Sequence, residues 1–272
     1  MKRFCAFFLA LCLMLSCSAC RWGGSGPQPS PAPKLSLPGK SPEQTSPGSP
    51  GSHSGTDTVP QPAAQANAEP PAEGPWSLVL VNGEHPLPQD FSVQTKSIPG
   101  YDDRMFDARA AAALEQMLDA AQQDGQPLYL VSSYRSIQRQ QALFTRKTNF
   151  YKSQGLCAEK AEEEAAKVVA RPGTSEHNLG LAADIVGADW YKTHDDLTEE
   201  FATTAASRWL AENAARFGFV LRYPKGKEKL TGVQYEPWHY RYVGPTAAAE
   251  LAKSGKCLEE YRKAQPAEKA AP

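Results

Sequence analysis

Apolar residues recur at helical or strand spacing along the larger, C-terminal part of the chain. Between residues 103 and 123 the apolar positions return every three or four residues, which predicts a helix that Gly125 ends. The apolar run PLYLVSSY (127–134) predicts a buried strand. A second helix is expected to begin after the N-cap residue Ser136 and to run towards Gly155.

The remaining pattern alternates helices with short strands. At the start, WSLVLV (76–81) predicts a strand that an Asn-Gly turn ends. The other predicted elements are a helix over 158–170, a strand at LGLAADIV, a long helix over 198–217, three short strands at FVLRYP, TGVQYE and HYRYV, and an Ala-rich helix after Pro245. Helices come early and short strands cluster late, which favours an α+β fold with a small, mainly antiparallel sheet flanked by helices.

Residues 21–75 differ in composition from the rest of the chain. They consist mainly of Pro, Gly, Ser, Ala, Thr and Gln, with almost no large apolar side chain. Such a segment cannot bury enough surface to offset the entropy of ordering, so we predict a disordered linker. As a flexible coil it would have an end-to-end distance of about 40 Å. The predicted folded domain is then 76–263, followed by a polar tail over 264–272.

The first 20 residues, MKRFCAFFLALCLMLSCSAC, have the three-part pattern of a secretory signal peptide. Their apolar run is too short for a comfortable membrane span. The ending SCSAC resembles the lipobox of bacterial lipoproteins, with Cys20 as the lipid acceptor. Cys17 and cleavage without lipidation are the alternatives. We therefore expect an exported protein on the extracytoplasmic face of a bacterial cell membrane, anchored there by lipid.

Charge and cysteine content narrow the classes of partner. The chain has 29 basic and 30 acidic side chains, a net charge of -1, and no basic run with interleaved aromatic residues. Nucleic-acid binding is therefore not expected. Of the six cysteines, only Cys157 and Cys257 fall in the predicted domain. A disulfide between them and two unpaired thiols are both open on sequence alone.

Three residues with metal-ligand chemistry lie beside predicted core strands: His177, Asp184 and His239. Two imidazoles and a carboxylate are the three protein ligands of a catalytic zinc site whose fourth position is left for water. Burying such groups is costly unless they are compensated, and a divalent cation would compensate them. Gly180 permits the tight return that would bring the His177 loop back over the strand of Asp184.

Glu236 and Arg135 are the candidates for catalysis. Glu236 stands three residues before His239, where a carboxylate can take a proton from a metal-activated water and pass it to a leaving amine. Residues three apart in a regular strand point to opposite faces, so Pro237 must mark a bulge or turn. Arg135, in SSYRS, lies where a strand meets a helix, with its guanidinium expected to be free to hold an oxyanion or carboxylate.

Together these segments resemble the D-alanyl-D-alanine carboxypeptidase family of the vancomycin-resistance type. Those enzymes are zinc peptidases of the superfamily that also holds lysostaphin-type endopeptidases and the hedgehog signalling domain. The matching segments are SSYRSIQRQQ, ARPGTSEHNLGLAADI, GFVLRYPKGKEKLTGVQYEPWHYRYVG and CLEEY, and the similarity covers about Trp76 to Tyr261. One departure is Ser133, where the family more often has Gly before Tyr.

The resemblance implies a hedgehog/D-Ala-D-Ala-peptidase-like fold and one Zn²⁺ ion. His177, Asp184 and His239 would be its ligands, Glu236 the catalytic base and acid, and Arg135 the residue that steadies the polarised carbonyl. The residues that the resemblance places around the terminal D-alanine are Gln140, Ser175, Tyr134, Tyr223 and Trp238. The implied reaction is removal of a C-terminal D-alanine from a peptidoglycan stem peptide, with D,D- and L,D-specificity both open.

Three other functions fit parts of this pattern. A peptidoglycan endopeptidase of the same superfamily would use the same metal and base. A zinc-containing module that binds the cell wall without cutting it would have no need of Glu236 or Arg135. A non-heme iron oxygenase shares the two-His-one-carboxylate set, but its usual ligand pair is closer in sequence than His177 and Asp184.

Overall fold

The computed structural model of the 272-residue chain describes residues 72–265. The predicted signal peptide (1–20), nearly all of the predicted linker (21–75) and the end of the predicted tail (264–272) lie outside the described residues. Within 72–265, no helix is both long and apolar enough to cross a membrane.

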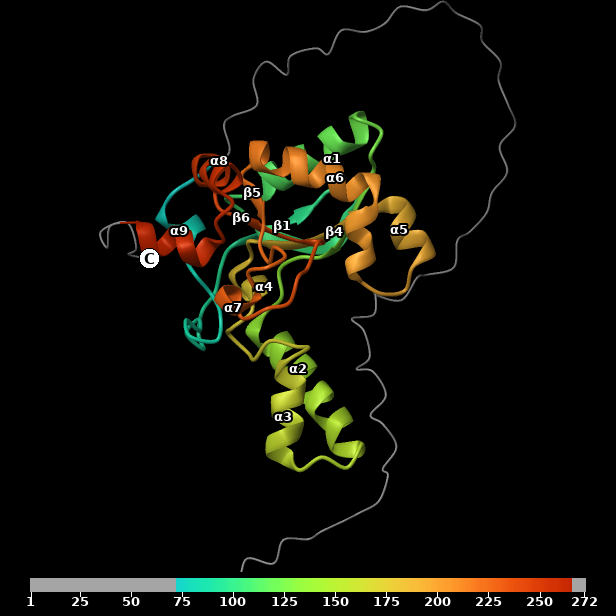
Figure 1. The fold of residues 1–272 in the computed structure, drawn as a ribbon, viewed down its shortest axis with the longest axis vertical. Helices are drawn as coiled ribbons and strands as arrows, with labels where there is room; N and C mark the ends of the chain where they lie inside the picture. Colours follow the sequence, from blue (N-terminus) through green and yellow to red (C-terminus); the bar gives the residue numbers. More distant parts are fainter. Residues whose placement is uncertain (1–71, 266–272) are drawn as a thin grey trace, which may run out of the picture. The chain divides into compact units, whose positions relative to one another are not determined.

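A four-stranded antiparallel sheet forms the centre of the fold, in the order β3-β4-β6-β5 (Figure 1). Its strands are β3 (Leu128–Ser132), β4 (Ala182–Gly187), β5 (Phe219–Leu221) and β6 (His239–Tyr242). Every residue of β4 and β6 is buried, as central strands covered on both faces should be. A separate antiparallel pair joins β1 (Thr95–Ile98) to β2 (Tyr101–Asp107). The α+β prediction with a small antiparallel sheet is confirmed.

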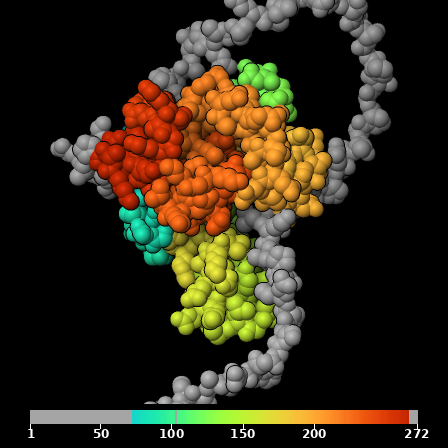
Figure 2. Space-filling model, in the orientation of Figure 1, coloured from blue at the N-terminus to red at the C-terminus, as the bar shows by residue number. Residues whose placement is uncertain are grey.

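Helices surround the sheet, and one helical pair extends away from it. The α-helices are α1 (Ala111–Gln123), α2 (Ile137–Ser153), α3 (Ala158–Ala166), α4 (Glu176–Leu179), α5 (Ala188–Thr193), α6 (Ala205–Asn213), α7 (Glu228–Thr231), α8 (Pro245–Ser254) and α9 (Leu258–Ala264). The 3-10 helices are η1 (Pro75–Leu78), η2 (Glu199–Thr203) and η3 (Ala214–Phe217). Figures 1 and 2 show α2 and α3 as a yellow-green lobe that projects from the region of the sheet.

Several predicted boundaries are confirmed by their local chemistry. The Ser136 hydroxyl accepts the backbone N–H of Arg139 at 3.1 Å, so it caps α2 as expected. Gly125 has a φ of 69°, which suits the left-handed turn after α1. Cys157 is an exposed free thiol and Cys257 a buried one, so the structure contains two separate thiols in place of a disulfide.

The strand predicted at 76–81 is wrong. Residues 75–78 form η1, and no strand follows it before β1. The carbonyls of Ser77 and Val79 accept the guanidinium of Arg241 at 3.0 and 2.8 Å. The Ser77 hydroxyl also donates to the carbonyl of Val243 at 2.9 Å. A buried side chain thus satisfies backbone groups that a strand would offer to a neighbouring strand.

The helix predicted over 103–123 begins later, at Ala111, because its first residues belong to β2. Asp107 explains the break. Its buried carboxylate accepts the backbone N–H of Arg109 at 2.9 Å and the Arg109 side chain at 2.6 Å. A local bond of this kind stabilises a turn and competes with the helix.

Three C-terminal predictions also need correction. The helix over 198–217 is divided into η2, α6 and η3, because Thr204 is extended and its hydroxyl caps a new helix by accepting the N–H of Ser207. The segment TGVQYE (231–236) forms no strand; its first residue ends α7 at a left-handed Gly232. Helix α9 is additional to the predicted elements, and it lies at the end of the predicted domain 76–263.

Candidate metal centre

Strand register brings two of the three predicted ligands together. Asp184 in β4 pairs directly with His239, the first residue of β6, and with Ser132 of β3 on its other side. Directly opposite residues in an antiparallel pair carry their side chains on the same face of the sheet. The two segments are distant in sequence, so only the sheet places this imidazole beside this carboxylate.

His177 reaches the same place from the short helix α4. The backbone N–H of Arg135 donates to the carbonyl of His177 at 3.0 Å, which ties α4 to the end of β3. Gly180 ends α4 with a φ of 83°, and an added Cβ there would lie 3.2 Å from Val93 Cγ1. A left-handed, tightly packed turn of this kind favours glycine. The tight return expected at Gly180 is therefore confirmed.

The three side chains form one buried cluster. His177 Nε2 lies 3.2 Å from Asp184 Oδ2, and His239 Nδ1 lies 2.9 Å from Asp184 Oδ1. One ligand atom from each residue lies within 4.8 Å of the other two. The exposed fractions are 6%, 2% and 4% for His177, Asp184 and His239. The predicted ligand set is thus assembled.

Each imidazole turns one nitrogen towards the cluster and the other into the protein. His177 Nδ1 donates to the carbonyl of Ser133 at 2.8 Å, which leaves Nε2 to face Asp184. His239 presents Nδ1 to Asp184, while its Nε2 lies 3.8 Å from Glu176 Oε2. Burial lowers the pKa of His177. Burial also opposes protonation of His239, but its hydrogen bond with Asp184 and the nearby carboxylate of Glu176 outweigh it and raise its pKa to about 10.

The donor chemistry of this cluster fits a zinc ion. Two buried imidazole nitrogens and one carboxylate face a common point, as in catalytic zinc sites with a fourth position for water. Burial works against ionisation of Asp184, but the two imidazoles outweigh it and hold the pKa of this carboxyl far below its ordinary value. A permanently ionised, buried carboxylate is suited to a divalent cation.

Glu236 lies beside the cluster at the end of a turn. The backbone N–H of His239 donates to the carbonyl of Glu236 at 3.1 Å, so Pro237 occupies a turn between them, as expected. Glu236 Oε2 is 3.6 Å from His239 Nδ1, and its side chain is 29% exposed. Burial raises the pKa of Glu236 to about 7. A carboxyl with this pKa can both accept and return a proton near neutral pH.

Arg135 is anchored rather than free, which corrects the expectation. Its Nη1 donates to Gln140 Oε1 at 2.9 Å and its Nη2 to Ser132 Oγ at 3.3 Å. Burial lowers the pKa of Arg135, and the charge of Asp184 partly offsets that effect. The guanidinium therefore lies within electrostatic reach of the metal ligands, held in place by two neutral side chains.

The residues predicted to line a substrate pocket occupy different environments. Gln140 is fully buried; besides accepting from Arg135, it donates to the carbonyl of Ala170 at 2.6 Å. Tyr223 is buried, with its ring centroid 4.8 Å from that of His239. Trp238 packs in the main hydrophobic core. The two others are Ser175, which is 8% exposed and precedes α4, and the half-buried Tyr134. Their binding roles stay predictions.

Sequence reasoning missed four charged residues behind the cluster. They are Glu176, Arg222, Arg241 and Glu259, all buried and connected by ion pairs of 2.6 to 2.7 Å. A signal was present, because Arg222 and Arg241 each interrupt an apolar strand segment. Buried charges need partners, so two such arginines predict acidic residues nearby.

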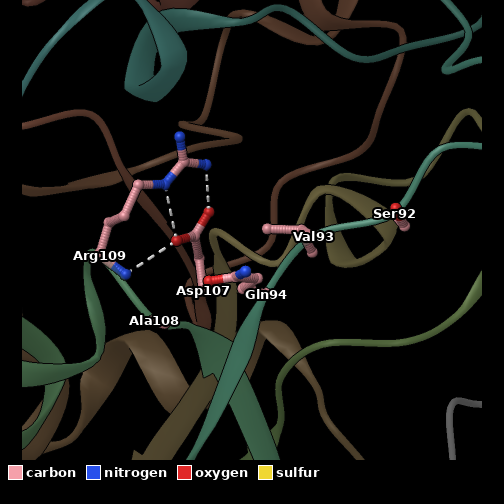
Figure 3. A pocket seen from close by; sticks show the side chains of 6 residues that line it. All are labelled: Ser92, Val93, Gln94, Asp107, Ala108 and Arg109. Atoms are coloured by element: carbon pink, nitrogen blue, oxygen red, sulfur yellow. Dashed lines mark hydrogen bonds and ion pairs between the residues drawn. The ribbon is translucent and has the colours of Figure 1, made fainter.

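A separate hollow has a volume of about 280 Å³. Figure 3 draws the residues that line it. Its six lining residues include none of the predicted site residues. The charged groups on its wall, Asp107 and Arg109, pair with each other, and the Arg109 guanidinium also lies 4.0 Å from the ring centroid of Trp76. The hollow therefore gives no reason to move the candidate site away from His177, Asp184 and His239.

Comparison with known proteins agrees with this geometry. The chain is 41% identical over 189 residues to a D-alanyl-D-alanine carboxypeptidase of Enterococcus faecalis, a match that covers 70% of this chain and 66% of the relative. It resembles the structure of a vancomycin-resistance D,D-pentapeptidase VanY mutant in complex with Zn(II), with 41% identity, a TM-score of 0.58 and coverage of 69% and 99%. It also resembles the LdcB LD-carboxypeptidase, with 36% identity, a TM-score of 0.59 and coverage of 70% and 87%.

A family match agrees with these relatives. Residues 103–245 match VanY, described as D-alanyl-D-alanine carboxypeptidase, and this region holds all the predicted metal ligands and Glu236. The chain belongs to the VanY family of D-alanyl-D-alanine carboxypeptidases.

Proposed function

We propose that the protein is a zinc-dependent carboxypeptidase that removes a C-terminal D-alanine from peptidoglycan stem peptides. One observation carries the proposal: a buried His177–Asp184–His239 cluster has a carboxylate, Glu236, 3.6 Å from the metal-facing nitrogen of His239. A protein that only bound the wall would have no use for a proton-transfer group at this position. Membership of the VanY family supports the same activity.

His177 Nε2, His239 Nδ1 and an Asp184 oxygen would hold the ion. When bound, zinc polarises a carbonyl and lowers the pKa of water, so that water becomes a nucleophile near neutral pH. Glu236 would accept the proton of the attacking water and return it to the departing amine of D-alanine. Its raised pKa suits both transfers. Ser133, through its carbonyl, would keep the His177 ring oriented throughout.

Arg135 would stabilise negative charge that develops on the carbonyl oxygen of the scissile amide. Its charge is fixed beside Asp184 by hydrogen bonds with Gln140 and Ser132, so little reorganisation is needed during the reaction. In this arrangement Gln140 would act by orienting Arg135, in addition to the pocket-lining role predicted from sequence. The two roles are separable, because only the first predicts that Gln140→Leu lowers turnover more than binding.

Product analysis tests the proposed reaction. The purified, zinc-loaded protein is incubated with a stem tetrapeptide, a stem pentapeptide and a cross-linked dimer, and the products are weighed by mass spectrometry. Loss of one D-alanine from the pentapeptide indicates D,D-specificity, and loss of D-alanine from the tetrapeptide indicates L,D-specificity. Cleavage of the dimer alone would instead indicate an endopeptidase. No cleavage of any of the three would contradict the proposal.

We also propose that the protein is exported and held at the membrane by lipid on Cys20. The support is the basic start, apolar run and small-residue ending of 1–20, followed by the Pro/Gly/Ser-rich segment 21–75 that would tether the domain 76–263. Cys20→Ser is expected to move the protein from the membrane fraction to the soluble fraction. Cys17→Ser is the matched control and should not. An unchanged distribution of Cys20→Ser would contradict anchoring at that residue.

A further inference from the structure

Two buried polar atoms behind the metal centre face each other. His239 Nε2 and Glu176 Oε2 are 3.8 Å apart, and each is buried without a hydrogen-bond partner among residues 72–265. Unpaired buried polar atoms are rare in folded proteins because each loses its hydration. The facing pair consists of one nitrogen that can donate and one carboxylate oxygen that can accept, so each matches what the other lacks.

The other oxygen of Glu176 fixes the direction of this carboxylate. Oε1 accepts from Arg222 Nε and from Arg241 Nη1, both at 2.7 Å. Two guanidiniums on the same oxygen hold it on the far side from His239. Oε2 is therefore aimed at the ring, and Glu176 has no freedom to turn it away without breaking two buried charge-assisted bonds.

The charges behind His239 balance within the network. Arg222 also forms a two-bond pair with Glu259, at 3.0 and 2.6 Å, and Glu259 belongs to α9. Two carboxylates and two guanidiniums are thus neutral as a set, and the side chains of Glu176, Arg222 and Arg241 are fully buried. Because Glu176 is already neutralised by Arg222 and Arg241, it does not compete with Asp184 for a metal ion.

We propose that Glu176 is a positioning residue that holds a proton on Nε2 of His239, so that Nδ1 of this ring is the nitrogen that binds the metal. Arg222 and Arg241 hold Glu176, and Glu259 extends the support to the C-terminal helix α9. Carboxylates that accept the second N–H of a ligand histidine fix its tautomer and increase its basicity. This inference rests on the proposed zinc site.

The variant Glu176→Gln tests the direction of the proton. The guanidiniums of Arg222 and Arg241 require an oxygen, so the amide oxygen of Gln would take the place of Oε1 and its NH₂ would face His239. An NH₂ group donates to Nε2, which moves the ring proton to Nδ1, the metal-facing atom. Zinc affinity, measured by competition with a chelator, is expected to fall roughly 10–100-fold, the range seen for second-layer carboxylates.

Glu259→Gln is the matched control. It removes the same charge from the same network, but Glu259 contacts Arg222 rather than His239. Its zinc affinity is expected to stay within roughly threefold of that of the unmodified protein. This is a smaller change than the roughly 10–100-fold loss expected when a carboxylate that orients a ligand histidine is altered. If both variants lose affinity equally, or if a folded Glu176→Gln protein binds zinc normally, the positioning role is wrong. Circular dichroism and thermal melting show whether each variant is folded.

An NMR measurement on the unmodified protein tests the tautomer of His239 even if Glu176→Gln does not fold. Two-bond ¹H–¹⁵N correlation of the zinc-loaded protein reports which nitrogen of His239 carries the proton. A proton on Nε2 is expected, and a proton on Nδ1 would overturn the proposal.

The two proposals fail in different ways. If the protein binds zinc and cleaves stem peptides, but its zinc affinity is unchanged in Glu176→Gln, only the positioning role is overturned. A protein that binds zinc and cleaves nothing contradicts the proposed reaction and leaves the affinity test of Glu176 in force. Absence of zinc binding in the unmodified protein would overturn both.

Discussion

The two histidines of the metal centre are held in different ways. His177 donates through Nδ1 to a neutral backbone carbonyl, that of Ser133, at the end of β3. His239 turns its second nitrogen towards Glu176, which belongs to a buried ionic network that extends to α9. One ligand is thus oriented by a single backbone carbonyl. The other is oriented by a charged network drawn from α4, the residue after β5, β6 itself and α9.

The two ways of orienting a histidine differ in their energetic cost. A carbonyl fixes the ring with little energetic cost, because backbone groups at the end of a strand need partners in any case. A buried carboxylate costs several kcal/mol unless cations compensate it, and here Arg222 and Arg241 do so. We therefore expect the His177 side to be sensitive to local changes, and the His239 side to depend on the whole network.

Removal of either imidazole is the strongest test of this comparison. His177→Ala and His239→Ala are both expected to lose zinc binding and to reduce hydrolysis to background, because two ligands cannot hold the ion at its working affinity. The variants should differ without metal. His239→Ala removes the group shared by Asp184 and Glu176, so its free energy of unfolding should be lower by roughly 1–3 kcal/mol.

Zinc affinity is measured by chelator competition, and activity by peptide hydrolysis. The free energy of unfolding of the metal-free variants is measured by urea unfolding in the presence of chelator. Equal stability of the two metal-free variants would contradict the asymmetry. Retained zinc affinity in either variant would contradict the ligand assignment itself.

Glu236→Gln separates chemistry from metal binding. The amide keeps the size of the side chain but cannot accept the proton of water, so turnover should fall roughly 10²–10⁴-fold, the usual contribution of a general acid–base group. Zinc content should be unchanged, because the metal-facing atoms belong to His177, Asp184 and His239. Hydrolysis at the original rate by the purified variant would exclude Glu236 from the reaction.

Arg222→Met tests the network through stability. It leaves Glu259 and part of the charge of Glu176 buried without a partner, so the free energy of unfolding should fall by roughly 3–5 kcal/mol. Lys227→Met is the control, since Lys227 also pairs with α9 but at a half-exposed position. Urea unfolding of the two variants should show a much larger loss for Arg222→Met. Similar losses would mean that burial of the network does not increase its contribution to the free energy of unfolding.

The smallest expected effect is an acid-dependent change in stability that involves the first turn of α9. A hydrogen bond from Lys227 and another from the backbone N–H of Cys257 lower the pKa of Glu260 from 4.5 to about 2. A carboxyl whose pKa is lowered by folding stabilises the folded state above its unfolded pKa. That contribution is lost as pH falls from 4.5 through about 2. The melting temperature of Glu260→Gln should therefore approach that of the unmodified protein as the solution is acidified.

Comparison of Glu260→Gln with the unmodified protein at neutral pH and near pH 3 checks this sign. A gap that widens on acidification would contradict it. The variant changes a half-exposed pair, so the effect should be smaller than that of Arg222→Met at every pH.

Local signals predicted most of the fold, and each failure has an identifiable cause. Helix α2 was predictable because Ser136 caps it, and β4 because apolar residues lie on both sides of Asp184. The strand predicted at 76–81 does not form, because the guanidinium of Arg241, distant in sequence, donates to the carbonyls of Ser77 and Val79. The helix starting at 103 failed because β2 pairs with β1. In the first failure a residue distant in sequence outweighed the local preference, and in the second a neighbouring hairpin strand did.

The sequence by itself determined the chemistry of the centre. Two histidines, an aspartate and a glutamate at these spacings are metal-site donors and a base whatever the details of the fold, because their ligand chemistry belongs to the side chains. The tertiary structure decided how each is used. The pairing of β4 with β6 sets Asp184 against His239, and the position of Glu176 selects which nitrogen of that ring faces the cluster. Such choices depend on distances between segments far apart in the chain, and local sequence patterns carry no information about those distances.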